Sequence, residues 1–229
     1  MATPGLFLRF CARLYQAIKS LPSKPRVRDV SFADRYSAAV LDFSDTVTTD
    51  VLTQWAQRLW RDTQPHEQQA CSSPKLIFWL GNTAQQSTFF AAVDELAQQQ
   101  MQHSKTLRNE QLVYSQYAAA LTQSTTWQGR FIQVISGQNV QQMLAAHSGQ
   151  MTYLVVNIDE IDDIAELQNA KLQTLTYAGC DKHALIDLLQ QPALDGIDRL
   201  VPVGQALECA TLGDGMDLLS MLSRRVTLE

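Results

Sequence analysis

The sequence predicts an α/β fold, in which helices cover both faces of a mostly parallel sheet. Short apolar runs rich in β-branched and aromatic residues alternate with longer amphipathic segments along most of the 229 residues, which is the order that such sheets require. The composition, 45% hydrophobic and 18% charged, is ordinary for a soluble globular chain. The length suffices for one large α/β domain or two small ones.

The first 29 residues differ from the rest in charge, and we expect the main domain to cover residues 30–229. Six basic residues precede Asp29, the first acid. This basic amphipathic segment is predicted to dock on a partner or on a further domain, and a helix lying on a membrane surface is the alternative. Apolar residues recur in it at roughly helical spacing: Leu6, Phe7, Phe10, Leu14, Ile18 and Leu21.

Charge and cysteine usage exclude several classes of protein. After the basic segment, twelve basic residues stand against 23 acidic ones, which gives no support to nucleic-acid binding. Cys11, Cys71, Cys180 and Cys209 form no C-x-x-C pair, so neither a metal site nor a disulfide framework is expected, and a reducing, cytoplasmic setting is favoured. No apolar run approaches the roughly 18–20 residues that span a bilayer, so no transmembrane segment is expected.

The first half should contain two strands and three helices. Residues 36–43 are an apolar run and predict the first strand. Apolar residues between 51 and 60 recur at helical spacing, so a helix should start at a cap among residues 46–49 and end near residue 62. The elements expected next are a strand at 76–80, a helix at 85–103 capped by Thr83, and a helix at 107–122.

The second half continues the alternation. Residues 130–135 and 152–158 predict strands, with a short helix at 140–146 between them. A helix is expected at 159–170, because its first residues are acidic and the helix macrodipole favours carboxylates there. The elements expected after it are a strand at 172–177, a helix at 181–194, a strand at 197–203 and a helix at 214–225. The last residues, 225–229, are either an edge strand or a frayed tail.

Cys71 is the candidate nucleophile. It lies between an amphipathic segment and an apolar strand, and Ala70, Ser72 and Ser73 beside it are small enough to leave the sulfur accessible. A thiol on a loop that a rigid scaffold positions is a plausible nucleophile. Taken alone the signal is weak, because most free cysteines are small buried hydrophobes.

Other candidate sites have simpler explanations. His66 could take the proton of Cys71 or lower the pKa of its thiol, but its position equally fits a helix-ending surface. Gly213-Asp214-Gly215 could bind an anion, although a tight turn with Asp214 as N-cap is favoured. Ser72 and Ser73 lack an identifiable base. The acids at 159–163 are interpreted as a solvated first turn.

At Cys71 the sequence resembles the long-chain acyl-CoA reductases of bacterial bioluminescence, a branch of the aldehyde dehydrogenase-like superfamily. The run 68–74 (Gln-Gln-Ala-Cys-Ser-Ser-Pro) before an aromatic-rich strand is similar to their nucleophile loop. Three more stretches agree in order and spacing, so the resemblance covers residue 30 to the C-terminus. These stretches are 32–42 at the first strand, 172–177 at a late strand, and 196–204 with the Asp-Gly turn at 214–216.

The resemblance implies a catalytic domain of the aldehyde dehydrogenase type and a reaction. The thiolate of Cys71 would attack an acyl-CoA thioester, expel CoA and form an acyl-enzyme. Hydride from NADPH would then give a thiohemiacetal that collapses to the aldehyde. The backbone N–H of Cys71 could be one donor to the developing oxyanion.

The sequence departs from this family in one respect. Family members carry a nucleotide-binding domain of some 200 or more residues, mostly before the catalytic domain, and no glycine-rich phosphate loop precedes residue 30 here. We therefore expect the catalytic half alone, with a separate nucleotide-binding subunit or a homo-oligomer as partners. The alternative is a truncated, non-catalytic relative that serves as a binding or assembly module.

Overall fold

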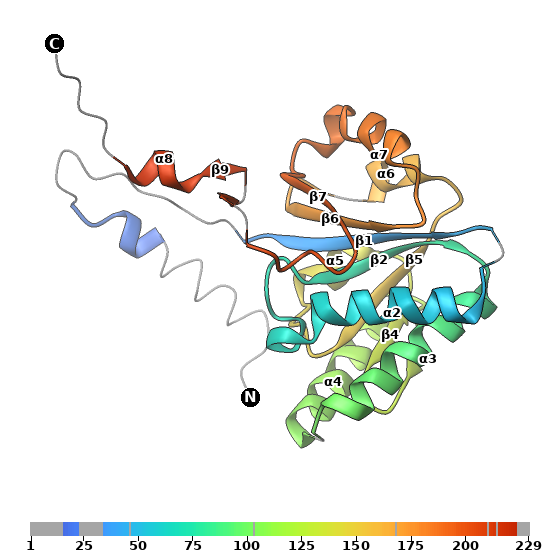
Figure 1. The fold of residues 1–229 in the computed structure, drawn as a ribbon. Helices are drawn as coiled ribbons and strands as arrows, with labels where there is room; N and C mark the ends of the chain where they lie inside the picture. The colour runs from blue at the N-terminus through green and yellow to red at the C-terminus, as the bar shows by residue number, and fades with distance from the viewer. Residues whose placement is uncertain are drawn as a thin grey trace, which may run out of the picture. The chain divides into compact units, whose positions relative to one another are not determined.

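A seven-stranded sheet forms the centre of the larger of two units into which the chain divides (Figure 1). The computed structural model describes residues 16–22, 34–45, 47–102, 104–167, 169–209, 211–213 and 215–223. Residues 34–208 form the larger unit, and residues 1–33 with 209–229 form the other. Most of the predicted segment 1–29 and all of 225–229 lie outside the described residues. Among the described helices, none has the length and apolarity needed to cross a bilayer.

The sheet is mostly parallel, as predicted. Its strand order is β3-β4-β5-β2-β1-β6-β7, and β3 alone runs antiparallel to its neighbour, β4. The strands are β1 (Tyr36–Phe43), β2 (Pro74–Gly81), β3 (Thr125–Gln128), β4 (Gln133–Ser136), β5 (Thr152–Asn157), β6 (Leu172–Ala178) and β7 (Arg199–Pro202).

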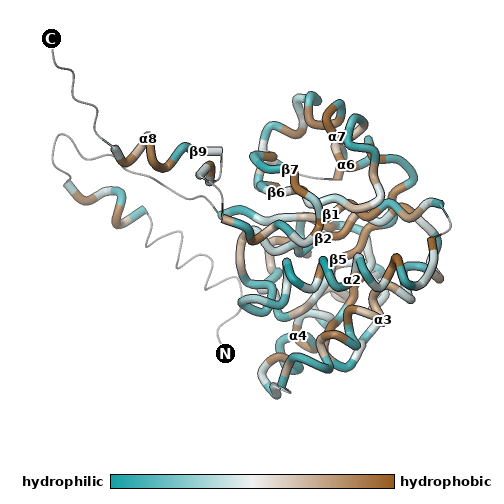
Figure 2. Tube along the Cα trace, viewed as in Figure 1, coloured by the Kyte–Doolittle hydropathy of each residue, from teal (hydrophilic) through white to brown (hydrophobic). Residues whose placement is uncertain are grey.

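Helices cover both faces of this sheet and form a core on each. Figure 1 shows α2 and α3 on one side of the sheet and α6 and α7 on the other. Trp79 and Phe89 lie in the first core, whereas Phe78 and Leu175 lie in the second; the apolar stretches of the central strands can be followed in Figure 2. The helices are α2 (Thr49–Thr63), α3 (Thr83–Gln100), α4 (Lys105–Leu121), α5 (Val140–Ala145), α6 (Ile164–Leu167) and α7 (Lys182–Leu189), with 3₁₀ turns η1 (Pro65–Gln68), η2 (Ile161–Asp163) and η3 (Pro192–Leu194).

Several predicted boundaries are wrong for local reasons. The cap of α3 is Asn82, whose side chain accepts a hydrogen bond from the backbone N–H of Gln85 at 2.9 Å, and not Thr83. The helix expected at 159–170 is reduced to η2 and α6. The helix expected at 181–194 ends at Leu189, because Pro192 cannot continue it. The strand β3 was not predicted, since its four residues are polar or exposed.

In the smaller unit, β8 (Leu212–Gly213) and β9 (Met216–Asp217) form an antiparallel pair followed by α8 (Leu218–Leu222). The helix expected from residue 214 therefore begins four residues later. Its N-cap is Asp217, whose side chain accepts a hydrogen bond from the backbone N–H of Ser220 at 3.1 Å. Gly215 has a φ of 72°, as a tight turn between these strands requires. Asp214 lies outside the described residues.

We call the edge of the sheet at which the parallel strands begin the amino edge. Buried Asp62 joins two segments of the chain at this edge. Its carboxylate is 1% exposed and accepts hydrogen bonds from the backbone N–H groups of Gly204 (2.6 Å) and Ala206 (2.9 Å). Burial raises the pKa of Asp62 to about 6, although these donors and the charge of Arg199 act in the opposite direction. Asp62 thereby ties the segment after β7 to the end of α2.

Buried His147 fixes a second segment at this edge. Its Nδ1 accepts a hydrogen bond from the backbone N–H of Gly149 (3.0 Å), so Nε2 carries the proton and donates to the carbonyl of Thr152 (2.8 Å). Burial, with the charge of Lys75, lowers the pKa of His147 to about 3. The turn that this ring holds brings Gly149 (φ 87°) against the backbone of Gln68, where a Cβ would lie 2.9 Å from the Gln68 carbonyl.

We predict that Asp62 and His147 affect stability in opposite directions as pH falls. The raised pKa of Asp62 gives a contribution that is fully present below the unfolded pKa of 3.8 and is lost as pH rises through about 6. The lowered pKa of His147 gives a contribution that is present above 6.5 and is lost as pH falls toward 3. Between about pH 4 and 6 the two nearly cancel.

In Asp62→Asn, the pH dependence that His147 gives to the free energy of unfolding should no longer be offset by Asp62. The free energy of unfolding, measured by urea titration at several pH values, should fall by about 1.4 kcal/mol per pH unit more steeply on acidification than in the wild type. At pH 7 the variant should also lose about 1–3 kcal/mol, because its amide would face a backbone N–H. His147→Gln is the matched control and should change the slope in the opposite direction. Parallel pH profiles of Asp62→Asn and wild type would contradict the account.

Candidate active site

Cys71 lies at the amino edge of the sheet, three residues before β2 begins at Pro74. The residue is exposed and its thiol is free, as its small neighbours predicted. Its sulfur lies 4.0 Å from the hydroxyl oxygen of Ser72. In α/β sheets ligands usually bind at the opposite edge, beyond the carboxyl ends of the strands. A site at Cys71 would therefore use a part of the fold that the sheet topology alone does not indicate.

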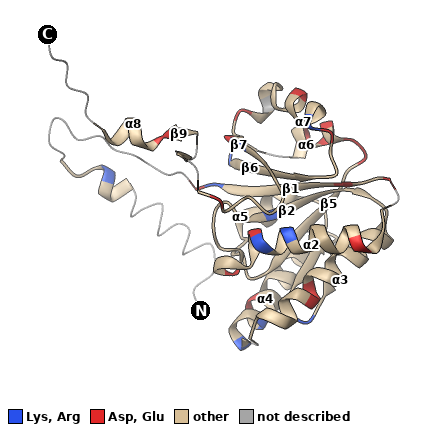
Figure 3. Ribbon diagram, viewed as in Figure 1, with Lys and Arg blue, Asp and Glu red and all other residues tan. Residues whose placement is uncertain are grey.

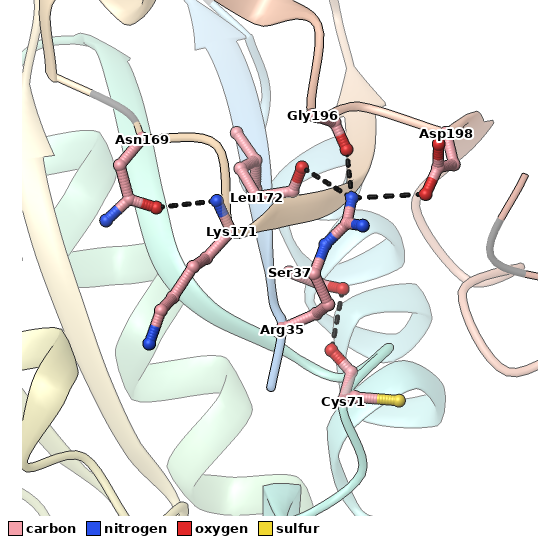
Figure 4. Close-up of polar contacts among 8 residues, drawn as sticks. All are labelled: Arg35, Ser37, Cys71, Asn169, Lys171, Leu172, Gly196 and Asp198. Atoms are coloured by element: carbon pink, nitrogen blue, oxygen red, sulfur yellow. Dashed lines mark hydrogen bonds and ion pairs between the residues drawn. The ribbon is translucent and has the colours of Figure 1, made fainter. Parts of the chain in front are cut away.

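Hydrogen bonds hold the loop on both sides of this thiol. The carbonyl of Cys71 accepts a hydrogen bond from the hydroxyl of buried Ser37 at 2.7 Å, and Figure 4 shows the sulfur directed away from that contact. The hydroxyl of Ser73 donates to the carbonyl of Asp62 at 2.7 Å. The amide of Gln68 donates to the carbonyl of Pro74 at 2.8 Å. The backbone at Cys71 is thus fixed while its side chain stays accessible.

The segment before this loop adopts an unfavourable backbone conformation. His66, Glu67 and Gln68 have φ values of 58°, 50° and 63°, and Gln150 and Met151 across from them have 60° and 52°. The N–H of Gln150 donates to the carbonyl of Glu67 at 2.9 Å, so the two left-handed segments are joined. Such conformations cost of order 1–3 kcal/mol per non-glycine residue and cluster at functional sites. Their position beside Cys71 supports a site there.

Lys75 is the cation nearest in sequence to Cys71, and it interacts electrostatically with the thiol. Its side chain is half-buried at the start of β2. Burial lowers the pKa of Lys75, whereas the negative charges of Asp34 and of ionised Cys71 oppose that shift. An ammonium group near a thiol favours the reactive thiolate. The placement of Lys75 therefore suits a nucleophilic cysteine.

Two other cations at the amino edge are engaged in ion pairs. Arg35 contacts the carboxylate of Asp198 at 3.1 Å and the carbonyl of Gly196 (Figure 4). Lys171 lies 3.0 Å from the carboxylate of Asp34. These pairs link the starts of β1, β6 and β7, so we assign them to the framework of the edge.

Two backbone donors remain available beside the thiol. Within the described residues, the N–H groups of Cys71 and Ser72 have no protein acceptor. Unpaired backbone N–H groups next to a nucleophile can stabilise the oxyanion that forms when it attacks a carbonyl. The donor expected at Cys71 is therefore free to act, and Ser72 offers a second.

The other candidate residues either lie apart from the Cys71 thiol or stabilise their own part of the chain. His66 has an exposed ring on η1, and its catalytic role stays a prediction. The hydroxyl of Ser73 is used by Asp62. The carboxylate of Asp163 accepts hydrogen bonds from the N–H groups of Asp159 and Glu160 at 3.0 and 3.1 Å, which caps their own turn. In the part of the chain that the structure describes, no three metal-ligating side chains come together.

Lys75 and Ser37 lie close to Cys71 in the structure but were not predicted from the sequence. Lys75 carries a recognisable signal, since it is a charged residue at the start of an otherwise apolar strand. Ser37 carries none, because its contact with Cys71 joins residues 34 apart in the chain and depends on the pairing of β1 with β2.

Solved structures with a similar fold include aldehyde dehydrogenases and an oxidoreductase. They include an oxidoreductase from Marinobacter aquaeolei (TM-score 0.55, 10% identity, 78% of this chain) and aldehyde dehydrogenase 21 from Physcomitrella patens in complex with the reaction product succinate (0.53, 9%, 78%). A putative methylmalonate-semialdehyde dehydrogenase from Sinorhizobium meliloti 1021, complexed with NAD, is also similar (0.51, 10%, 76%). This chain spans 40% of the length of each. The similarity confirms the predicted catalytic-domain fold.

No match to a curated protein was found. The model of the acyl-CoA reductase (LuxC) family matches residues 13–225, which is most of the chain. The resemblance seen in the sequence around Cys71 is confirmed by that match and by the fold, and this chain belongs to the acyl-CoA reductase (LuxC) family.

Proposed function

We propose that this chain is the acyl-transfer half of an acyl-CoA reductase and that Cys71 accepts the acyl group. The observation that carries the proposal is the accessible thiol on a loop fixed on both sides by hydrogen bonds, in a member of an acyl-CoA reductase family. A fixed backbone with an exposed nucleophile lowers the entropy lost when thiol and substrate meet.

The transfer needs no oxidant or reductant. The thiolate of Cys71 attacks the carbonyl carbon of the thioester, and a C–S bond forms as the C=O bond opens to an oxyanion. The N–H groups of Cys71 and Ser72, which have no acceptor among the described residues, would donate to that oxyanion. When the carbonyl reforms, the C–S bond to CoA breaks, and CoA leaves as a thiolate that takes a proton from solvent. One thioester is exchanged for another.

Lys75 assists by holding positive charge near the thiol. Its burial makes the ammonium group less screened by water than a surface lysine. Its positive charge would stabilise the negative charge on the attacking sulfur and on the oxyanion that follows. We assign Lys75 the role of activating the nucleophile and not of transferring a proton.

Reduction of the acyl-enzyme to an aldehyde requires a nicotinamide coenzyme, for which NADPH is the form that the family implies. The described residues do not fit one. At the carboxyl ends of β1 and β6 the following helices are capped by Thr48 and Asp181, and Asp50 lies in the first turn of α2. The carboxylates of Asp50 and Asp181 place negative charge at these helix N-termini and oppose a pyrophosphate. We therefore propose that a separate nucleotide-binding domain or subunit provides the coenzyme, and we derive no hydride step here.

A binding or assembly module without catalysis is the second candidate, favoured by that same lack of fit in the described residues. Both functions are compatible with a reducing cytoplasm, which would keep Cys71 as a thiol. They differ in whether Cys71 forms a covalent adduct.

We predict a covalent acyl adduct on Cys71. The full chain is incubated with a long-chain acyl-CoA, digested at low pH and analysed by peptide mass spectrometry. The peptide that contains Cys71 should gain the mass of the acyl group, and Cys71→Ala should abolish the adduct. Cys209→Ala is the matched control, since Cys209 is also an exposed free thiol, and it should leave the adduct unchanged. A folded wild-type protein without adduct would favour the binding module, and equal labelling of Cys209 would show unselective chemistry.

We predict that Lys75→Met slows the alkylation of Cys71 by iodoacetamide at pH 7, because it removes the positive charge that interacts with the sulfur. Lys75→Arg keeps the charge and should retain most of the rate. The alkylation of Cys209 in the same sample serves as the internal standard. A rate at Cys71 unchanged in folded Lys75→Met would remove Lys75 from the mechanism.

A further inference from the structure

Lys75 occupies an irregular position in the sheet. Ser37 of β1 pairs with Pro74 of β2, whereas the next residue of β1, Ala38, pairs with Leu76. Lys75 is therefore an extra residue between two paired ones, and it has no ladder partner on β1 or on β5. In Figure 3 the central strands are mostly tan, the colour of residues other than Lys, Arg, Asp and Glu. Bulges of this kind often lie next to active sites, where they turn a side chain in a new direction.

A turn brings the chain at Cys71 back toward this lysine. A backbone hydrogen bond of 3.1 Å closes the turn 70–73, in which Cys71 is a central residue. The hydroxyl of Ser37 donates to the carbonyl of Cys71 at 2.7 Å, and the backbone of Ser37 pairs with Pro74, the residue before Lys75. One serine of β1 therefore contacts both the loop that carries the thiol and the residue next to the bulge.

The amino group of Lys75 is not held in an ion pair. Its side chain is half-buried, and among the described residues no carboxylate lies within ion-pair distance of it. Lys171 at the same edge differs, because it is paired with Asp34 at 3.0 Å. The groups that interact electrostatically with Lys75 are Asp34, Cys71 and His147, and His147 is neutral at pH 7 because its pKa is lowered to about 3. Within this set, the thiol is the group whose charge changes during acyl transfer.

Acylation of Cys71 changes the protonation of this lysine. Burial lowers the pKa of Lys75, and the negative charge of ionised Cys71 opposes that shift. A thioester carries no charge, so formation of the acyl-enzyme removes this opposing contribution and lowers the pKa further. The same event places an electrophilic carbonyl carbon on the sulfur. A buried lysine with a lowered pKa is a nucleophile toward carbonyl groups. The acyl-enzyme therefore brings together an amine that loses its proton more readily and a thioester.

We propose, on the basis of the function proposed above, that an acyl group left on Cys71 without reduction moves to the Nζ atom of Lys75. The neutral amine attacks the thioester carbonyl carbon, a C–N bond forms, and the C–S bond to Cys71 breaks. Water takes a proton from the nitrogen, and the departing thiolate takes one from solvent, so the step needs no oxidant or reductant. The products are an amide on Lys75 and a free thiol. Because the amide is uncharged, Lys75 then no longer activates Cys71.

The test follows both adducts in the full chain. The protein is incubated with a long-chain acyl-CoA without coenzyme, freed of unbound acyl-CoA by gel filtration, and quenched in acid at intervals. One half of each sample is digested with pepsin at low pH to measure the thioester on Cys71. The other half is treated with neutral hydroxylamine, which cleaves thioesters and leaves amides, and is then digested with trypsin.

The tryptic peptides distinguish the two forms of Lys75. Unmodified Lys75 is a cleavage site and gives the peptide 62–75, whereas acylated Lys75 is not cleaved and gives the peptide 62–105 with the added acyl mass. We expect this hydroxylamine-resistant peptide to increase as the thioester on Cys71 decreases. In Lys75→Arg, which cannot form the amide, the acylated peptide should be lost and the thioester should last longer than in the wild type.

Two controls separate transfer from direct acylation by acyl-CoA. Cys71→Ala should lose the amide on Lys75, because the transfer starts from the thioester, and an amide that persists in this variant would overturn the proposal. Lys171, an exposed lysine at the same edge, should remain unmodified in the wild type. Acylation of Lys171 to the same extent as Lys75 would show unselective chemistry and would also overturn it. Circular dichroism establishes that each variant is folded.

The outcomes distinguish this inference from the proposed function. A thioester on Cys71 that decays to the free thiol with no amide on Lys75 overturns the transfer alone and leaves acyl transfer to Cys71 standing. A folded wild type that carries neither adduct overturns both. A thioester that is replaced by the amide, with the amide dependent on Cys71, supports both.

Discussion

The parallel pairing of β1 with β2 determines where Cys71 can lie. Ser37 pairs with Pro74 at the start of the two strands, and the register shifts between Ser37 and Ala38. That pairing brings the Ser37 hydroxyl to the Cys71 carbonyl. Both strands are buried on both faces by helices, so they cannot slide without exposing core residues. The position of the thiol is therefore a consequence of how these two buried strands pair.

Near Cys71, the amino edge of the sheet contains several energetically unfavourable features that the rest of the fold stabilises. Five residues in two adjoining segments have left-handed backbone, a buried carboxylate is held by two N–H groups, and a buried neutral imidazole holds the turn at Gly149. Each is unfavourable by itself. A protein retains such features where geometry matters more than stability, which agrees with a functional site beside Cys71.

Much of the framework could be predicted from local sequence. The strand at residues 36–43 has the bounds that its apolar run predicted, and Thr48 caps α2 within the expected range. Local reasoning failed where tertiary contacts decide the outcome. The turn at 159–163 closes on its own carboxylates and shortens the helix, and β3 is a strand because it pairs with β4. Cys71 was found from its neighbours, whereas Ser37 required knowledge of the strand pairing.

The features of the candidate site also divide into those predictable from local sequence and those that depend on tertiary contacts. A thiol between small residues is visible in sequence, but its loop hydrogen bonds and the nearby charge of Lys75 are long-range or depend on burial. In the proposed function, attack on the thioester and departure of CoA would use groups at the amino edge. At the carboxyl edge, where a dinucleotide would be expected, the N-termini of α2 and α7 are already capped.

The most direct test of acyl transfer is the amount of CoA released in the first turnover after rapid mixing with excess acyl-CoA and acid quench. The account predicts a burst approaching one equivalent of CoA per folded chain without any nicotinamide coenzyme, and no burst in Cys71→Ser. A wild type that releases no CoA, or a Cys71→Ser variant with the same burst, would contradict it.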